Sequence, residues 1–63
     1  MKKRILVIED EENLIELLRI NIERRSFEVD TACDGEEGLA KAFSRPYDAV
    51  LLNVRLPGMD GWE

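Results

Sequence analysis

The sequence predicts an α/β protein built on a small parallel sheet. Three short segments, residues 5–8, 28–33 and 49–52, have the composition of strands and are bounded by turn residues. A segment with helical periodicity separates each strand from the next, and this alternation implies right-handed crossovers between parallel strands. With 63 residues the chain forms one domain at most, and a core of this size gives only marginal stability.

The first predicted strand, Ile5–Ile8, is apolar at every position, which suits a central strand covered on both faces. The acids Glu9 and Asp10 follow it directly, and Glu11 and Glu12 continue the acidic run into a helix. Acids at a helix start are favoured by the positive end of the helix dipole. That explanation suits the second pair of acids better than the first, so the first pair is a candidate ligand pair.

The first helix is predicted over about Glu12 to Arg25. Its apolar residues fall within an arc of roughly 160° when successive residues are placed about 100° apart. The residues of this arc are Leu14, Ile15, Leu17, Leu18 and Ile22. Ile20 lies outside the arc and widens it. A stripe of this width exceeds what contact with one sheet needs, so we expect the helix to touch the sheet and a second surface.

The second predicted strand, residues 28–33, alternates only in part and is therefore expected at the edge of the sheet. Cys33 is predicted to be a small buried residue at the end of this strand rather than a reactive thiol. Because the chain has one cysteine and no histidine, an intramolecular disulfide, a cysteine-based zinc site and a nucleophile–histidine pair are excluded.

The second helix is predicted to begin at Asp34 and Glu37, which have the spacing of a capping box. Glu37 and Lys41 form a favourable pair four residues apart, and Pro46 ends the helix. The predicted apolar face of this helix consists of Leu39, Ala42 and Phe43.

The third predicted strand is the apolar run Ala49–Leu52, which stops abruptly at Asn53 and has the pattern of a buried strand. A polar turn follows, with Arg55, Pro57, Gly58, Asp60 and Gly61. The segment Asp60–Glu63 repeats the capping-box spacing and predicts the start of a third helix. A helix start without its helix predicts that the sequence is a fragment.

In open parallel sheets, ligands bind beyond the carboxyl ends of the strands, so Glu9, Asp10 and Asn53 are expected to meet at one edge. Two carboxylates with an oxygen ligand from the next strand suit Mg²⁺. A third carboxylate at position 53 could serve as a ligand and as a nucleophile toward a phosphoryl group. Asn53 offers an uncharged carbonyl oxygen and is not a competent nucleophile, so we expect weak magnesium binding.

The net charge of −5 argues against binding of nucleic-acid phosphates by this chain. The basic start, Met1–Arg4, precedes an apolar run of only four residues. That run is too short for a signal peptide or a membrane span, so no membrane association and a cytoplasmic location are expected.

Three stretches together make a specific match: ILVIEDEENL, FEVDTACDGEEGLAKA and PYDAVLLNVRLPGMDGWE. Over essentially the whole chain they resemble the amino-terminal half of the receiver domain of bacterial two-component response regulators. The LPGMDG turn, Leu56–Gly61, is a strong marker of the family. Its residues resemble those of the winged-helix, DNA-binding class of response regulators. The resemblance implies that residues 1–63 are a truncated, flavodoxin-like half-domain with three parallel strands in the order 2-1-3.

The resemblance also implies roles for particular residues. The family's magnesium-binding acid pair corresponds to Glu9 and Asp10, and the position of its phospho-accepting aspartate is occupied by Asn53. The backbone carbonyl of Arg55 would be a further metal ligand, and the implied partner of the intact parent is a sensor histidine kinase. The aspartate is replaced, and the half that carries the family's Ser/Thr and Lys is absent. Loss of phosphorylation is therefore expected.

Three functions stay open at this point. The first is a phosphorelay receiver fragment that is inactive as a phospho-acceptor. The second is a structural half-domain, natural or engineered, that folds by self-association and retains no chemistry. The third, a magnesium-dependent phosphoryl-transfer enzyme using Glu9 and Asp10, ranks lowest because only carboxylates are present to act as nucleophile or base. We therefore expect no enzyme activity.

In a 2-1-3 sheet the apolar segment Ala49–Leu52 would form a bare edge, which invites pairing with another chain. A homo-oligomer is therefore expected, most simply a two-fold dimer in which this strand pairs antiparallel with its own copy. Pairing through helix faces is the alternative.

Overall fold

The computed structural model describes residues 2–53. Its elements, in order, are β1 (Arg4–Glu9), α1 (Glu12–Glu23), β2 (Glu28–Ala32), α2 (Gly35–Ser44) and β3 (Ala49–Asn53). The predicted order of strands and helices is thus confirmed. The predicted turn at 54–61 with its ligand Arg55, and the predicted helix start at Asp60–Glu63, lie outside the described residues.

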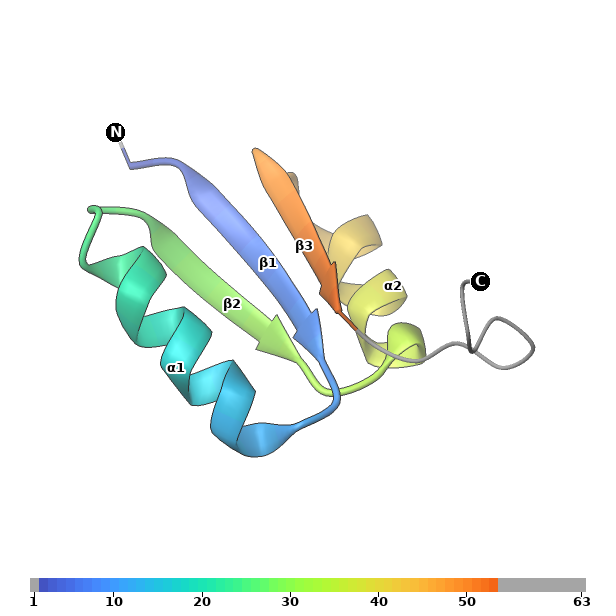
Figure 1. Ribbon diagram of the computed structural model, residues 1–63. Coiled ribbons are helices and arrows are strands. Elements are labelled where there is room, and N and C mark those ends of the chain that lie inside the picture. Colours follow the sequence, from blue (N-terminus) through green and yellow to red (C-terminus); the bar gives the residue numbers. More distant parts are fainter. Residues whose placement is uncertain (1, 54–63) are drawn as a thin grey trace, which may run out of the picture.

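The strands form one parallel sheet in the order β2-β1-β3, which confirms the predicted flavodoxin-like half-domain (Figure 1). β1 lies in the centre and β2 lies at an edge, as their sequence patterns predicted. The last pair of the β1–β3 ladder is Glu9 beside Asn53. The register of the sheet therefore brings two of the candidate site residues together.

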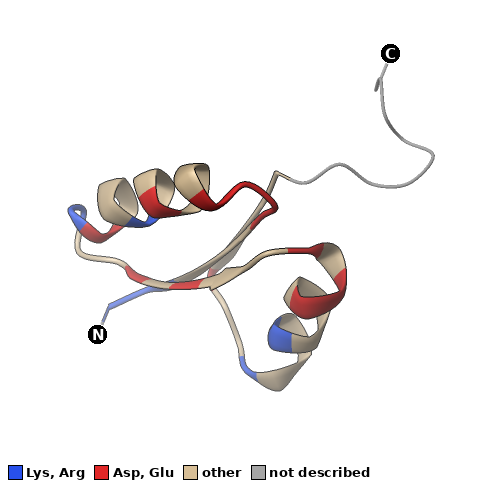
Figure 2. Cartoon of the chain, turned by 90° about the horizontal axis from the view of Figure 1, so that it is seen from below, with Lys and Arg blue, Asp and Glu red and all other residues tan. Residues whose placement is uncertain are grey.

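The two helices lie on opposite faces of the sheet (Figure 2), and each packs on β1 and β2. This arrangement follows from the order of the strands, because two right-handed crossovers that run in opposite directions place their helices on opposite faces. Each helix within residues 2–53 lacks the length and apolar character that a membrane crossing would need.

The core is centred on β1, which explains the unbroken apolar sequence of that strand. Leu6, Val7 and Ile8 are buried, together with Ala32 of β2. Gly38 brings α2 close to this core, since a Cβ atom at that position would overlap the side chain of Ile8. A larger residue would therefore push α2 away from the sheet.

The start of α2 contains one half of the predicted capping box. The Asp34 carboxylate accepts a hydrogen bond from the Glu37 N–H at 2.7 Å. The Glu37 carboxylate accepts from the N–H of Cys33 at 3.0 Å instead of bonding back to the capping residue. The predicted pair of Glu37 with Lys41 is present at 3.3 Å, and α2 ends at Ser44, before the proline.

The end of α1 lies at Glu23, two residues before the predicted boundary. Ser26 follows with a φ of 70°, in the left-handed region. Its N–H donates to the carbonyl of Glu23 at 3.0 Å. This turn stops the helix before Arg25 and directs the chain into β2.

The prediction that Cys33 is buried is wrong, because the residue is exposed. β2 ends one residue earlier, at Ala32, and the chain leaves the sheet there to begin α2. The thiol consequently lies outside the core and donates to the Glu37 carboxylate at 3.1 Å.

The apolar pattern of the third strand suggested burial, which is wrong because every residue of β3 is exposed; the predicted bare edge is confirmed. Within the described part of the chain, β3 contacts β1 along one side and neither helix packs on it. The predicted apolar face of α2 is likewise exposed, with Leu39 at 59% and Phe43 at 84% of full exposure. α2 approaches the sheet through Gly38, which turns these side chains away from the core.

Candidate functional site

The candidate site lies at the edge where β1 and β3 end, and its centre is a contact between Glu9 and Asn53. The Nδ2 atom of Asn53 donates a hydrogen bond to Oε1 of Glu9 at 2.5 Å. The two residues are a register pair on neighbouring parallel strands, so both side chains lie on the same face of the sheet. Glu9 is 2% exposed although it carries a carboxylate.

The second oxygen of the Glu9 carboxylate is also occupied. Oε2 accepts a hydrogen bond from the backbone N–H of Glu11 at 2.9 Å, which closes the bend between β1 and α1. Each oxygen of Glu9 therefore has a donor from the protein, and no buried side-chain polar atom among residues 2–53 lacks a partner. A buried carboxylate needs such partners because desolvation of a charge is costly.

The other predicted ligands lie differently. Asp10 is exposed at the bend after β1, and the hydrogen bonds of the described residues join Asn53 to Glu9 rather than to Asp10. The predicted ligand Arg55 lies outside the described residues. Sequence reasoning placed the acids and Asn53 at one edge but did not predict the Glu11 N–H as a partner of Glu9.

The donor set suits a hydrated magnesium ion, though with few protein ligands. Carboxylate oxygens are hard ligands, and Mg²⁺ usually takes one or two of them while keeping several waters. Among residues 2–53 no group of three or more Asp, Glu, Cys or His residues is placed to hold a metal. Asn53 turns its amide nitrogen toward Glu9, so the amide would have to rotate to offer its oxygen to a cation.

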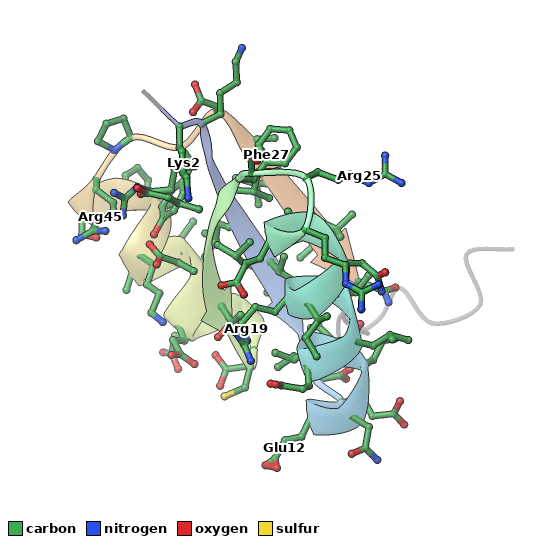
Figure 3. The ribbon with its side chains drawn as sticks, turned by 90° about the vertical axis from the view of Figure 1, so that its left-hand side faces the viewer. Lys2, Glu12, Arg19, Arg25, Phe27 and Arg45 are labelled. Carbon is green, nitrogen blue, oxygen red and sulfur yellow. The ribbon has the colours of Figure 1, made fainter. Side chains whose placement is uncertain are left out.

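The charges around this edge favour cations. Acidic residues gather where β1 ends and where both helices begin: Glu9, Asp10, Glu11, Glu12, Asp34, Glu36 and Glu37. Figure 3 shows Lys2 and Arg45 at the end of the sheet where the strands begin, and Glu12 at the opposite end. At the basic end Arg4 pairs with Glu28 at 2.7 Å. The candidate site therefore lies in a field of negative charge.

A second cluster surrounds Glu37 at the start of α2. The N–H of Cys33, the Cys33 thiol and the Lys41 ammonium lower the pKa of Glu37 to about 2. The same carboxylate raises the pKa of the Cys33 thiol, chiefly because it accepts a hydrogen bond from the thiol. The thiol is therefore held in its protonated form, which is not the environment of a reactive cysteine.

A third cluster joins the basic end of the sheet. The Tyr47 hydroxyl donates to the Asp30 carboxylate at 2.7 Å, and Arg45 and Arg4 lie 3.4 and 3.6 Å from the same carboxylate. The Tyr47 bond is the main reason that the pKa of Asp30 is lowered, and the two arginines add to the effect. This cluster links β1, β2 and the segment before β3, so it holds these three segments together. No pattern in the sequence predicted the contact between Tyr47 and Asp30.

The family model and the similar proteins that match this chain all point to the same family. The response regulator receiver domain family matches residues 5–63. The chain is 49% identical over 63 residues to the alkaline phosphatase synthesis transcriptional regulatory protein PhoP of Bacillus subtilis, an overlap that covers 100% of this chain and 26% of that protein. It is 42% identical over 60 residues to the response regulator ArlR of Staphylococcus saprophyticus and of Staphylococcus aureus, covering 95% of this chain and 27% of each. The chain thus spans about a quarter of the length of these relatives.

Proposed function

Because this chain belongs to the response regulator receiver domain family, we propose that it is the amino-terminal portion of a phosphorelay receiver that cannot accept a phosphoryl group at position 53. The observation that carries the proposal is the place of Asn53, at the end of β3 and in contact with the buried acid Glu9. A carboxylate at this place could attack phosphorus, whereas an amide has neither the charge nor the free lone pair of a nucleophile.

Glu9 and Asp10 are the residues of this chain that would hold magnesium, with the backbone carbonyl of Arg55 as a further ligand. A bound Mg²⁺ offsets negative charge on the oxygens of a transferring phosphoryl group. With an amide at position 53 the site has two carboxylates instead of three, so magnesium binding is weak. The chain by itself is a signalling module and not an enzyme.

The partners follow from the family and from charge. The intact parent would receive its signal from a sensor histidine kinase in the cytoplasm. The net charge of −5 disfavours contact of residues 1–63 with nucleic acid, so any DNA binding would belong to another part of the parent. That PhoP is a transcriptional regulatory protein supports a parent that regulates transcription.

The test is incubation with acetyl phosphate and magnesium, followed by intact mass spectrometry. The expected result is no phosphoryl adduct. An adduct that maps to residues 49–53 by peptide fragmentation would overturn the proposal. The receiver domain of a phosphorylatable relative, treated in parallel, establishes that the donor is active.

A second candidate function is that of a self-associating structural module without signalling chemistry. It is favoured by β3, which is exposed at every residue and carries no charged side chain. Charged residues commonly protect sheet edges from pairing, and β3 lacks that protection. The simplest assembly is a two-fold dimer in which β3 pairs antiparallel with its copy. Pairing through the exposed face of α2, with Leu39 and Phe43, is the alternative.

A further inference from the structure

We propose that the Asn53 side chain takes the place of a cation at the Glu9 carboxylate, so that β1 and β3 stay joined at this edge without metal. The inference rests on the proposed function, because it concerns the same site. It adds a role that an inactive acceptor position does not require. Asn53 is a positioning residue here, and its effect is read in the stability of the metal-free chain.

The first observation is the environment of Glu9. Glu9 is 2% exposed, so water does not hydrate its carboxylate. Its Oε1 atom accepts from Asn53 at 2.5 Å, and its Oε2 atom accepts from the Glu11 N–H at 2.9 Å. The Glu11 bond is local and closes a bend, whereas the Asn53 bond spans 44 residues of sequence. Among residues 2–53, the Asn53 bond is therefore the one side-chain hydrogen bond that ties the end of β3 to β1.

The second observation is what other side chains would do at the same place. An aspartate at position 53 would set two carboxylates side by side at the last pair of the ladder, where their like charges repel each other. A leucine or alanine would leave Oε1 of Glu9 without its partner in a buried place. A neutral donor such as the asparagine amide satisfies Glu9 without a cation.

A competition follows from this geometry. A cation that binds Oε1 of Glu9 must displace the Nδ2 atom of Asn53 from the same oxygen. Magnesium also gives up its waters reluctantly, so the ion has little to gain from the exchange. The stability of the unmodified chain should therefore change little between chelator and magnesium.

The experiment measures urea unfolding of four chains at one fixed protein concentration, in EDTA and in magnesium chloride. The chains are the natural one, Asn53→Asp, the swap Glu9→Gln with Asn53→Asp, and Asn13→Asp. In the swap, the new glutamine donates to the new aspartate and its oxygen still accepts from the Glu11 N–H, so the bond pattern is kept with its polarity reversed. Asn13→Asp is the matched control, because it makes the same chemical change on an exposed residue of α1.

In EDTA, Asn53→Asp should raise the unfolding equilibrium constant about tenfold or more, since it leaves a buried carboxylate without its donor. Magnesium should reverse much of that loss. In EDTA, the unfolding equilibrium constant of the swap should lie within about threefold of that of the unmodified chain. The constant of the Asn13→Asp control should lie within the same range. If Asn53→Asp does not fold in EDTA, recovery in the swap still supports the proposal.

Two results would overturn it. One is an unfolding constant for Asn53→Asp in EDTA that equals that of the natural chain. The other is a swap that is no more stable than Asn53→Asp alone, because the loss would then come from something other than the lost donor. No phosphodonor is used, so a failure here is separate from the appearance of a phosphoryl adduct, which tests the proposed function.

Discussion

The hydroxyl of Tyr47 donates a hydrogen bond to the carboxylate of Asp30, 17 residues earlier in the chain, at 2.7 Å. The bond joins the segment that leads into β3 to the edge strand β2, across the central strand. It also lowers the pKa of Asp30 below its ordinary value of 3.8. Two arginines, Arg4 and Arg45, form salt bridges with the same carboxylate.

The Asp30 cluster should make stability sensitive to acid. Because the folded pKa of Asp30 is lowered, its contribution is complete above pH 3.8 and is lost as the pH falls through the folded value. Tyr47→Phe removes the main cause of the shift and should lower the free energy of unfolding near pH 7 by roughly 0.5–1.5 kcal/mol. Urea titrations at neutral pH and near pH 3 should show a smaller loss from Tyr47→Phe in acid. An equal loss at both pH values would contradict this account.

The Cys33 thiol should become more reactive when Glu37 is neutralised. Its pKa is raised because it donates to the Glu37 carboxylate and lies in that negative field. Glu37→Gln should lower the thiol pKa and increase the rate of alkylation by iodoacetamide near pH 8, measured by mass spectrometry. Glu36→Gln, also in the first turn of α2, is the control and should leave the rate nearly unchanged. Equal rates in the two variants would show that the Glu37 contact does not govern the thiol.

Acid should also weaken the start of α2. The pKa of Glu37 is about 2 in the folded chain against an ordinary 4.5, so its contribution is complete above pH 4.5 and is lost between that pH and about 2. Glu37→Gln should flatten the acid dependence of stability in this interval. Unfolding followed by circular dichroism from pH 6 to pH 2 measures the difference, and curves that stay parallel to those of the natural chain would argue against the assignment.

A glycine at position 26 should stabilise the chain. Ser26 has a φ of 70°, a conformation that costs a residue with a Cβ atom more than it costs glycine. Ser26→Gly should raise the free energy of unfolding by roughly 0.5–1 kcal/mol, after the added freedom of the unfolded chain is set against the relief. Ser44→Gly, at the end of α2, is the comparison and should be neutral or destabilising. A loss of stability in Ser26→Gly would mean that the serine side chain has a role in the turn.

Magnesium affinity should rise when the third charge is restored. The natural chain offers the carboxylates of Glu9 and Asp10, and Asn53→Asp adds another at the same edge. Calorimetric titration with magnesium chloride should therefore give a lower dissociation constant for Asn53→Asp. Equal or tighter binding by the natural chain would refute this. The same variant is not expected to be phosphorylated efficiently, because the resemblance to the family implies that its Ser/Thr and Lys lie outside residues 1–63.

Self-association should depend on β3. Light scattering over a dilution series, with a thermal melt at each concentration, should show a mass above that of the monomer and a midpoint that rises with concentration. Val50→Lys places a charge on the exposed edge strand and should shift the chain toward monomer, whereas Leu17→Lys on the exposed side of α1 should not. A monomer mass with a melt that does not change on dilution would rule out the assembly.

The sequence predicted the elements, their order and the meeting of Glu9 with Asn53, because these depend on local periodicity and on the polarity of parallel strands. It failed for Cys33 and β3, where burial depends on what packs against a residue rather than on the residue itself. The orientation of the Asn53 amide could not be predicted from the sequence either. That orientation follows from the need of the buried Glu9 for a donor, and the burial of Glu9 emerges only once β1, β3 and the bend before α1 are assembled.

The separation of charge along the strands also affects how molecules arrive at the site. A phosphodonor is an anion, and it must diffuse toward an edge crowded with carboxylates before any bond to it can form. Encounters with anions are therefore slowed at low ionic strength and speed up as salt shortens the range of the repulsion to about 10 Å at 0.1 M. Encounters with divalent cations change in the opposite direction. The acidic edge thus favours the approach of cations over that of anions, whichever residue stands at position 53.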